Sequence, residues 1–232
     1  MRTVFQSIVL CMLLMGMGSP TCTQSDIPLG GPEDGFVDYY LIGEWQRPKV
    51  GGEQADWWAT IEPSGETEMV FDLDGPQQIR MTWNNKEFVG YSTWLKGNKY
   101  LNLRMVECLD CSNEKQELLK GDVCPYQILR YWTYVPELLL AYESDSKIAA
   151  IKKANKAALG RLLLVALMDP SFVKEQIAAG QVAGIEECDT CFWRGVCLRA
   201  AEDKLRRFVV EHESDIYLSD AGLYIRANQA FR

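Results

Sequence analysis

The cysteines carry the most specific chemical pattern in this sequence, which contains eight of them. Six form two clusters that share a Cys-x-x-Cys pair followed by a third cysteine: Cys108, Cys111 and Cys124, and Cys188, Cys191 and Cys197. Thiols at this spacing can form disulfides, bind zinc as thiolates, or serve as a redox-active dithiol. The rest of the chain decides which chemistry to expect.

Disulfides are the interpretation that we favour, because the start of the chain indicates export to an oxidising compartment. Six cysteines allow 15 pairings. Since each cluster holds three cysteines, complete oxidation needs at least one bridge between the clusters. Such a bridge would tie residues 106–126 to the C-terminal half, and closing so long a loop stabilises a fold by about 3 to 5 kcal/mol in the entropic model.

Two alternatives use the same cysteines. The two Cys-x-x-Cys pairs could supply a tetrahedral all-thiolate zinc site, which would leave Cys124 and Cys197 for one disulfide. A thiol oxidoreductase is the third hypothesis, since the strand, Cys-x-x-Cys, helix order of residues 101–120 imitates thioredoxin-like enzymes. Neither a βαβ pattern nor a basic residue accompanies the pairs, and the Asp inside each pair tends to raise a thiol pKa.

The first residues predict an export signal. Arg2 precedes an apolar run over residues 8–17, and small residues lead up to Cys22. This layout is typical of a cleaved secretory signal over residues 1–21, and the run is shorter than the ~20 apolar residues of a spanning helix. A bacterial lipoprotein is cut before a cysteine at this position, so we predict a lipid anchor at Cys22, with plain secretion as the alternative. The expected location is the periplasm or outer membrane of a bacterium, or the medium.

Other catalytic chemistry finds little support. His212 is the only histidine, and a packed or helix-terminal role suits it better than catalysis. The sequence has no Gly-x-Ser-x-Gly elbow, dinucleotide or Walker loop, His-Glu-x-x-His or haem motif. We therefore expect no catalytic residue, no metal and no cofactor, and a non-enzymatic protein. The net charge of −8 also argues against nucleic acid as a partner, because its affinity depends on Lys and Arg.

The elements that must position these residues predict an α+β protein. After a linker over residues 22–37, we expect an antiparallel, calycin-like β-barrel or curled sheet over residues 38–143 and an α+β tail over residues 144–232. Leu101, Leu103 and Met105 alternate with Asn102 and Arg104, which predicts one face inward and one in water. The predicted barrel strands cover residues 39–45, 57–62, 68–73, 78–83, 90–95, 99–106, 126–134 and 137–142. Turns are expected at residues 63–65, 74–76, 84–85 and 97–98.

The tail alternates between helical and extended patterns. A helix is expected over residues 147–160, a buried strand over 162–168, and a helix that Asp169 caps and that ends at Gly180. The strand 181–186 and the helix 200–212 follow. Short strands over residues 216–218 and 223–225 complete the tail.

Tryptophans mark the predicted barrel, which holds six of the seven in the chain. They could line a pocket for an apolar ligand. They could equally fill a small barrel, the interpretation that we favour, because large aromatic side chains contribute most of the burial in such a core. The candidate pocket or core residues are Trp45, Trp57, Trp83, Trp94 and Trp132.

Gly43-Glu44-Trp45 resembles the Gly-x-Trp signature of lipocalins and the wider calycin group. That resemblance implies that Trp45 closes one end of an up-and-down barrel whose mouth holds an apolar ligand. The Thr-Asp-Tyr signature of lipocalins is absent, and the long tail is not theirs. The whole layout is similar to bacterial secreted proteins and lipoproteins, which implies a location and a fold but no reaction.

The function expected from the sequence is that of an envelope protein that binds a hydrophobic small molecule or a partner protein. The alternatives are a structural or assembly accessory of the envelope and, less favoured, a thiol oxidoreductase that uses a Cys-x-x-Cys pair.

Overall fold

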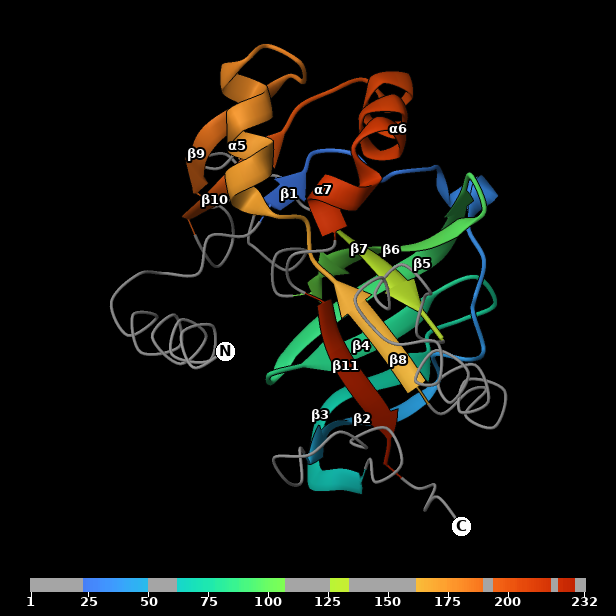
Figure 1. Ribbon diagram of the computed structural model, residues 1–232. Coiled ribbons are helices and arrows are strands. Elements are labelled where there is room, and N and C mark those ends of the chain that lie inside the picture. The colour runs from blue at the N-terminus through green and yellow to red at the C-terminus, as the bar shows by residue number, and fades with distance from the viewer. Residues whose placement is uncertain are drawn as a thin grey trace, which may run out of the picture.

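The computed structural model describes residues 23–49, 62–106, 126–133, 162–189, 194–217 and 221–227 (Figure 1). Several predictions fall outside these residues. They are the export signal, the lipid anchor at Cys22, Trp57, the first cysteine cluster, Cys191, the strand 137–142 and the helix 147–160.

Eight antiparallel strands close into a barrel, which confirms the predicted barrel and the α+β class. Neighbouring strands follow one another along the chain, and pairing of the first with the last completes the ring. In this order the strands are β2 (Gly43–Lys49), β3 (Glu62–Leu73), β4 (Ile79–Trp83), β5 (Lys86–Leu95), β6 (Asn98–Met105), β7 (Tyr126–Trp132), β8 (Leu162–Ala166) and β11 (Ala221–Arg226).

Tight turns connect the central hairpins. Asn84 and Asn85 have φ values of 50° and 60°, and Lys96 and Gly97 have values of 51° and 83°. Two left-handed residues in a two-residue loop match the twist of the flanking strands. The turns predicted at residues 84–85 and 97–98 are therefore present, the second displaced by one residue.

The turn predicted at residues 63–65 is wrong, because these residues lie inside β3. The pairing of β2 with β3 shifts register near Gln46, and Gly65 adopts a φ of 92° there. The backbone N–H of Gly65 donates to Gln46 Oε1 at 2.9 Å. Glycine thus allows a bulge where the sequence pattern suggested a reversal.

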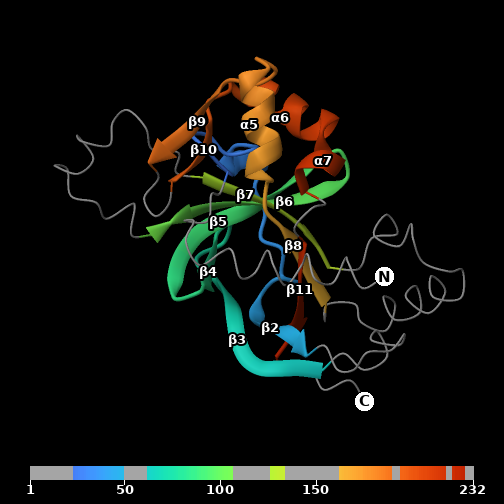
Figure 2. The same cartoon turned by 60° about the vertical axis from the view of Figure 1, so that its left-hand side comes forward.

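The chain between the last two barrel strands forms a second layer, which lies on the outer side of the barrel (Figures 1 and 2). Its elements are α5 (Pro170–Ala178), β9 (Gly184–Asp189), β10 (Arg194–Leu198), α6 (Glu202–Glu211) and α7 (Glu213–Tyr217). We call residues 167–220 the insertion. Since β8 and β11 flank it, the barrel draws two strands from residues 144–232, where the sequence predicted only a tail.

Local signals in the insertion were mostly predictive. Asp169 caps α5, and its Oδ1 accepts hydrogen bonds from the backbone N–H groups of Ser171 and Phe172 at 2.8 and 3.3 Å. The helix predicted over residues 200–212 is α6. The strand predicted over residues 216–218 is wrong where it is described, because Ile216 and Tyr217 end α7 and are buried.

The start of the described chain is packed, in contrast to the linker predicted for residues 22–37. The short strand β1 (Thr23–Ser25) pairs in parallel with β10, and Ser25 also pairs with Tyr126 of β7. Leu29 is buried, and its N–H donates to Asn102 Oδ1 at 2.7 Å. A single turn of 3₁₀ helix, η1 (Pro32–Asp34), follows.

Two hydrophobic cores lie on the two sides of the barrel wall. Strand β8 contributes to both: Leu163 and Val165 point into the barrel, whereas Leu162, Leu164 and Ala166 face the insertion. Burial on both faces explains why residues 162–168 form a continuous apolar run instead of an alternating one.

Candidate functional site

The candidate tryptophans do not gather in one pocket. Trp45 lies in the barrel interior, where its Nε1–H donates to the Leu41 carbonyl at 2.7 Å and the Arg226 guanidinium sits 4.9 Å from its ring. Trp83 packs against the same core. Trp132 belongs to the other core, on the side of the insertion. Trp94 is 51% exposed, with Phe36 stacked on it at 5.8 Å.

Large side chains fill the barrel interior in the described residues. The interior core is dominated by residues that are at most 1% exposed: Leu41, Trp45, Met69, Phe71, Ile79, Met81, Leu101, Leu103 and Leu163. This is the packing expected of a small barrel whose interior is a core. With the interior filled, the rim and the outer wall are the parts of the described barrel that can offer a binding site.

A short segment lies across the end of the barrel at which β5 ends and β6 begins; we call it the rim segment, residues 36–42. Phe36 exchanges two backbone hydrogen bonds of 2.9 Å with Ser92 of β5, beyond the point where β4 stops. At its other end, Arg226 donates to the carbonyls of Tyr40 and Ile42 at 2.7 and 2.9 Å. The segment is thus fixed at one end to β5 and at the other end to β11, the last strand of the barrel.

Asp38 is the buried acid of the rim segment, and the sequence analysis did not single it out. Its Oδ2 lies 2.5 Å from Lys99 Nζ and accepts a hydrogen bond of 2.9 Å from the Tyr131 hydroxyl. The Tyr131 oxygen also lies 2.9 Å from Ser92 Oγ. Burial, and then the charge of Asp38, raise the pKa of the Tyr131 phenol well above its usual range. These groups satisfy one another, so they hold the rim segment in place and offer no unpaired acid or base.

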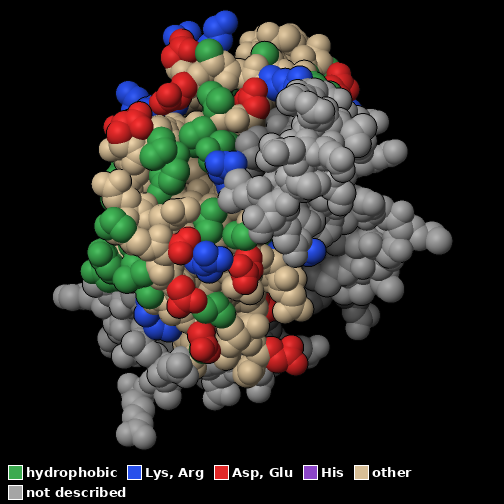
Figure 3. Space-filling view, turned by 180° about the vertical axis from the view of Figure 1, so that it is seen from behind, with side chains coloured by type: hydrophobic (Ala, Val, Ile, Leu, Met, Phe, Trp, Pro, Cys, Tyr) green, Lys and Arg blue, Asp and Glu red, His purple; other side chains and the backbone are tan. Residues whose placement is uncertain are grey.

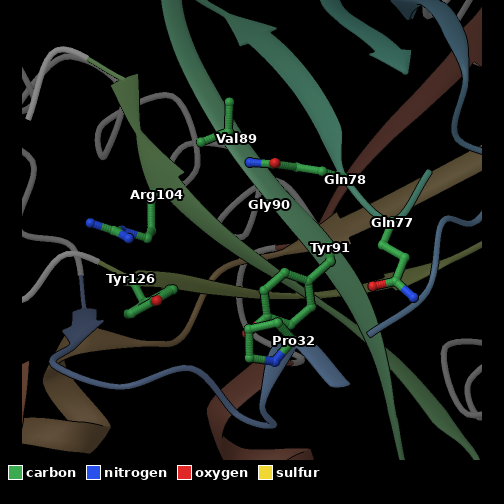
Figure 4. A pocket seen from close by; sticks show the side chains of 8 residues that line it. All are labelled: Pro32, Gln77, Gln78, Val89, Gly90, Tyr91, Arg104 and Tyr126. Carbon is green, nitrogen blue, oxygen red and sulfur yellow. The ribbon is translucent and has the colours of Figure 1, made fainter. Parts of the chain in front are cut away.

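A groove of about 340 Å³ lies on the outer wall of the barrel (Figure 4). Val89, Arg104 and Tyr126 stand side by side across β5, β6 and β7 and form its floor. Its lining comprises Pro32, Gln77, Gln78, Val89, Gly90, Tyr91, Arg104 and Tyr126. The turn between β3 and β4 supplies the two glutamines, and η1 supplies Pro32.

Gly90 allows the strands beneath the groove to approach one another closely. A Cβ atom at this position would lie 1.9 Å from the Asn102 carbonyl oxygen. Only glycine fits so near a neighbouring backbone. Gly90 adds no side chain to the groove, so the floor is built by Val89, Arg104 and Tyr126.

Arg104 is the cation of this groove. Its guanidinium stacks 5.5 Å from the Tyr126 ring, and its Nε is buried without a hydrogen-bond partner. Several other described arginines pair with carboxylates, such as Arg47 with Glu68 at 2.8 Å and Arg130 with Glu213 at 3.2 Å, and Arg226 donates to backbone carbonyls. Within the described residues, Arg104 makes no such pair.

The structure corrects the position expected for Asn102 and adds a role for Arg104, two residues of the outer wall. Asn102, expected in water, is fully buried because the chain around Leu29 covers it, and it donates to Thr93 Oγ1 at 3.1 Å. Arg104 was recognised only as an outward-facing residue. No local signal could have joined it to Gln77 and Gln78, because the three meet only after β3 to β6 have paired.

Of the other residues that the sequence singled out for chemistry, the structure describes the side chains of Cys197 and His212. Cys197 is fully buried and disulfide-bonded. No second cysteine side chain is described, so no bridge can be traced and the pairing of the six cysteines stays a prediction. His212 ends α6 and packs between the rings of Phe172 and Phe208, at 5.5 and 5.2 Å. Among the described residues, no group of three or more His, Cys, Asp or Glu side chains is arranged to hold a metal.

The described strands thus define an antiparallel, up-and-down, eight-stranded closed barrel with a groove on its wall. The chain matches no family model, no curated protein and no solved structure. In the part of the chain that the structure describes, no helix has the length and apolar character needed to cross a bilayer.

Proposed function

We propose that this chain is a non-enzymatic binding protein, exported to the cell envelope or secreted, that holds a hydrophobic small molecule in the groove on its outer wall. The observation that carries this proposal is the groove itself, found on a barrel whose interior side chains already fill the space. The lipocalin resemblance suggests the barrel mouth as the ligand site, and the packing supports the outer wall instead.

The composition of the groove suits such a ligand. Val89, Tyr91, Tyr126 and Pro32 offer apolar surface, while the glutamine amides and Arg104 offer a few hydrogen bonds. Small-molecule sites are typically concave, mostly apolar and about 300 to 1,000 Å³ in volume, with a small number of polar groups that fix orientation. A groove of about 340 Å³ falls at the lower end of that range.

The location rests on the sequence. The predicted export signal and the possible lipid at Cys22 favour an envelope protein. The disulfide at Cys197 supports an oxidising compartment, because disulfides persist there and are rare in the reducing cytosol. We keep disulfides among all six cysteines as part of the proposal.

A partner protein is the second candidate ligand. Tyr39, Tyr40, Leu73 and Trp94 are large apolar side chains that are about half exposed or more. All four lie near the end of the barrel that carries the rim segment. On the rear face, hydrophobic side chains gather along one side, with acidic and basic groups among and beside them (Figure 3). Aromatic residues are enriched where proteins bind one another. An assembly accessory and a thiol oxidoreductase remain the lesser alternatives.

Native mass spectrometry tests the proposal. The full chain, extracted gently from its own envelope, should carry a small noncovalent adduct. The Val89→Trp substitution should remove this adduct, because the indole would fill the groove. The control is Thr82→Trp, on the outer wall of β4 outside the groove, and it should keep the adduct.

Each outcome has a clear meaning. An adduct that survives Val89→Trp would contradict the groove as the ligand site. A protein that carries only a partner chain would favour the second candidate. Intact mass before and after reduction, with thiol alkylation, would count the disulfides and reveal any acyl chains at Cys22.

A further inference from the structure

We infer that the groove recognises an anionic ligand: Arg104 binds a carboxylate, sulfonate or phosphate group on an otherwise flat, apolar molecule. This inference rests on the proposed function, since it names the chemical class of ligand for the same groove.

The first argument is the unsatisfied state of Arg104. The guanidinium has five N–H donors and is charged at any physiological pH. Here its buried Nε has no partner, and no carboxylate pairs with it in the described residues. Partial burial without an anion is costly for a cation, so an anion that enters the groove would relieve this cost. The chain carries eight more acids than bases, which makes a partly buried cation without an acidic partner more notable.

The second argument is the layout of the groove. Arg104 and Tyr126 lie on one side, Gln77 lies on the other, and Val89 and Gly90 lie between them (Figure 4). Pro32 and Tyr91 lie at the edge of the groove, away from Arg104. An anionic group at Arg104 would therefore leave an apolar ligand body over Val89.

The third argument concerns shape. The Arg104 guanidinium lies over the Tyr126 ring, with its Cζ 5.5 Å from the ring centroid, and this cation–π contact restrains its position. A planar guanidinium binds two oxygens of one anion side by side, an arrangement that lysine cannot reproduce. The Gln77 amide on the side away from Arg104, and the Gln78 amide beside Val89, would accept hydrogen bonds from polar groups of the ligand or donate to them.

The test uses two fluorescent probes with the same flat body. One, 1-anilinonaphthalene-8-sulfonate, carries an anion, and the other, N-phenyl-1-naphthylamine, is neutral. Titration of the full chain with each probe gives two dissociation constants. Arg104→Met should weaken sulfonate binding by about tenfold or more and change neutral binding by less than about twofold, because a charge-assisted hydrogen bond stabilises only the anion.

Three further variants complete the design. Arg104→Lys should lose part of the sulfonate affinity, since it keeps the charge but not the paired donors. Arg207→Met, at an exposed arginine of α6, is the matched control and should change neither constant. Val89→Trp should weaken both probes. Circular dichroism of each variant checks that it is folded.

The outcomes separate the two proposals. If Val89→Trp weakens both probes but Arg104→Met weakens neither, or both equally, the groove binds ligands and the anion inference is overturned. If Val89→Trp changes neither probe, both the anion inference and the groove as the ligand site are overturned. Selective loss of the sulfonate probe in Arg104→Met supports both.

Discussion

Asp38 connects more of the molecule than any other single side chain in the described rim. It is 4% exposed, and its carboxylate meets Lys99, Tyr131 and the backbone N–H of Tyr40. A buried charge that loses its partner is strongly destabilising, whereas an exposed pair contributes little. The rim cluster should therefore be sensitive to loss of this one acid.

Asp38→Asn tests this sensitivity. The substitution leaves Lys99 and Tyr131 without the carboxylate, and it should lower the free energy of unfolding by about 3 kcal/mol, at the low end for a buried pair because Lys99 is 20% exposed. Urea unfolding followed by tryptophan fluorescence measures the change. Arg47→Met breaks an exposed ion pair and should cost less than about 1 kcal/mol. Equal losses of unfolding free energy in the two variants would show that the buried rim cluster stabilises the fold no more than an exposed ion pair does.

The limits of prediction at the residue scale are visible in neighbouring positions of β7. Tyr131 faces the interior core, and Trp132 faces the insertion, because successive residues of a strand point to opposite sides. The sequence showed two aromatic residues in a strand but not which face each would take. A shift of register by one residue would have exchanged them. For the same reason, the list of tryptophans could not define a pocket.

Among the elements, β8 is the strand that joins the two cores. One face of β8 packs in the core inside the barrel, and the other face packs against the insertion. Most barrel strands of this kind have one face toward water, so substitutions on that face are tolerated. In β8 neither face has that freedom.

Leu163→Ala and Leu164→Ala should therefore both be costly, although they point in opposite directions. Each creates a cavity in a buried core, and the expected loss in the free energy of unfolding is about 2 to 5 kcal/mol. Thr82→Ala, on the outer wall of β4, should cost less than about 1 kcal/mol. Chemical denaturation of the three variants gives the comparison. A mild effect at Leu164 would mean that the insertion packs loosely on the barrel.

The periodicity of apolar residues predicted many elements correctly. It did not predict which strands pair with one another, because that depends on distant parts of the chain. The alternation of Leu101, Leu103 and Met105 correctly placed the interior face of β6, and the capping signal of Asp169 correctly started α5. Short apolar stretches carry no clear period, which is why residues 216–217 were assigned to a strand and form a helix. The membership of β8 and β11 in the barrel depends on contacts between distant parts of the chain. No local pattern contains that information.

Several buried tyrosines make the stability of the whole molecule depend on pH. Tyr100, Tyr131 and Tyr217 are at most 2% exposed, and burial raises the pKa of each phenol above its usual range. Glu213 raises the pKa of Tyr100 further through a hydrogen bond, and the Arg130 charge works in the opposite direction. The three phenols bind their protons more tightly in the folded chain than in the unfolded chain.

Alkaline pH should therefore unfold the protein. Below the ordinary tyrosine pKa of about 10, the folded and the unfolded chain both keep the phenol protons, and these tyrosines do not lower the free energy of unfolding. Above it, the unfolded chain releases protons that the folded chain retains, so stability falls by about 1.4 kcal/mol per pH unit for each such tyrosine. Urea midpoints between pH 8 and 12 measure the slope, and Tyr131→Phe should make it shallower. Full tyrosine ionisation at 295 nm without loss of circular dichroism would contradict the prediction.

The closure of the barrel between β2 and β11 sets the order of events when the chain is made. Trp45 pairs with Arg226, so the ring cannot close until the chain has left the ribosome or a translocation channel as far as residue 226. Until then, β2 and β8 each keep an open edge, and open edges invite pairing with other chains. Folding by such distant contacts is slow. A truncated product that ends before residue 221 would not be a smaller working protein but a substrate for chaperones and proteases.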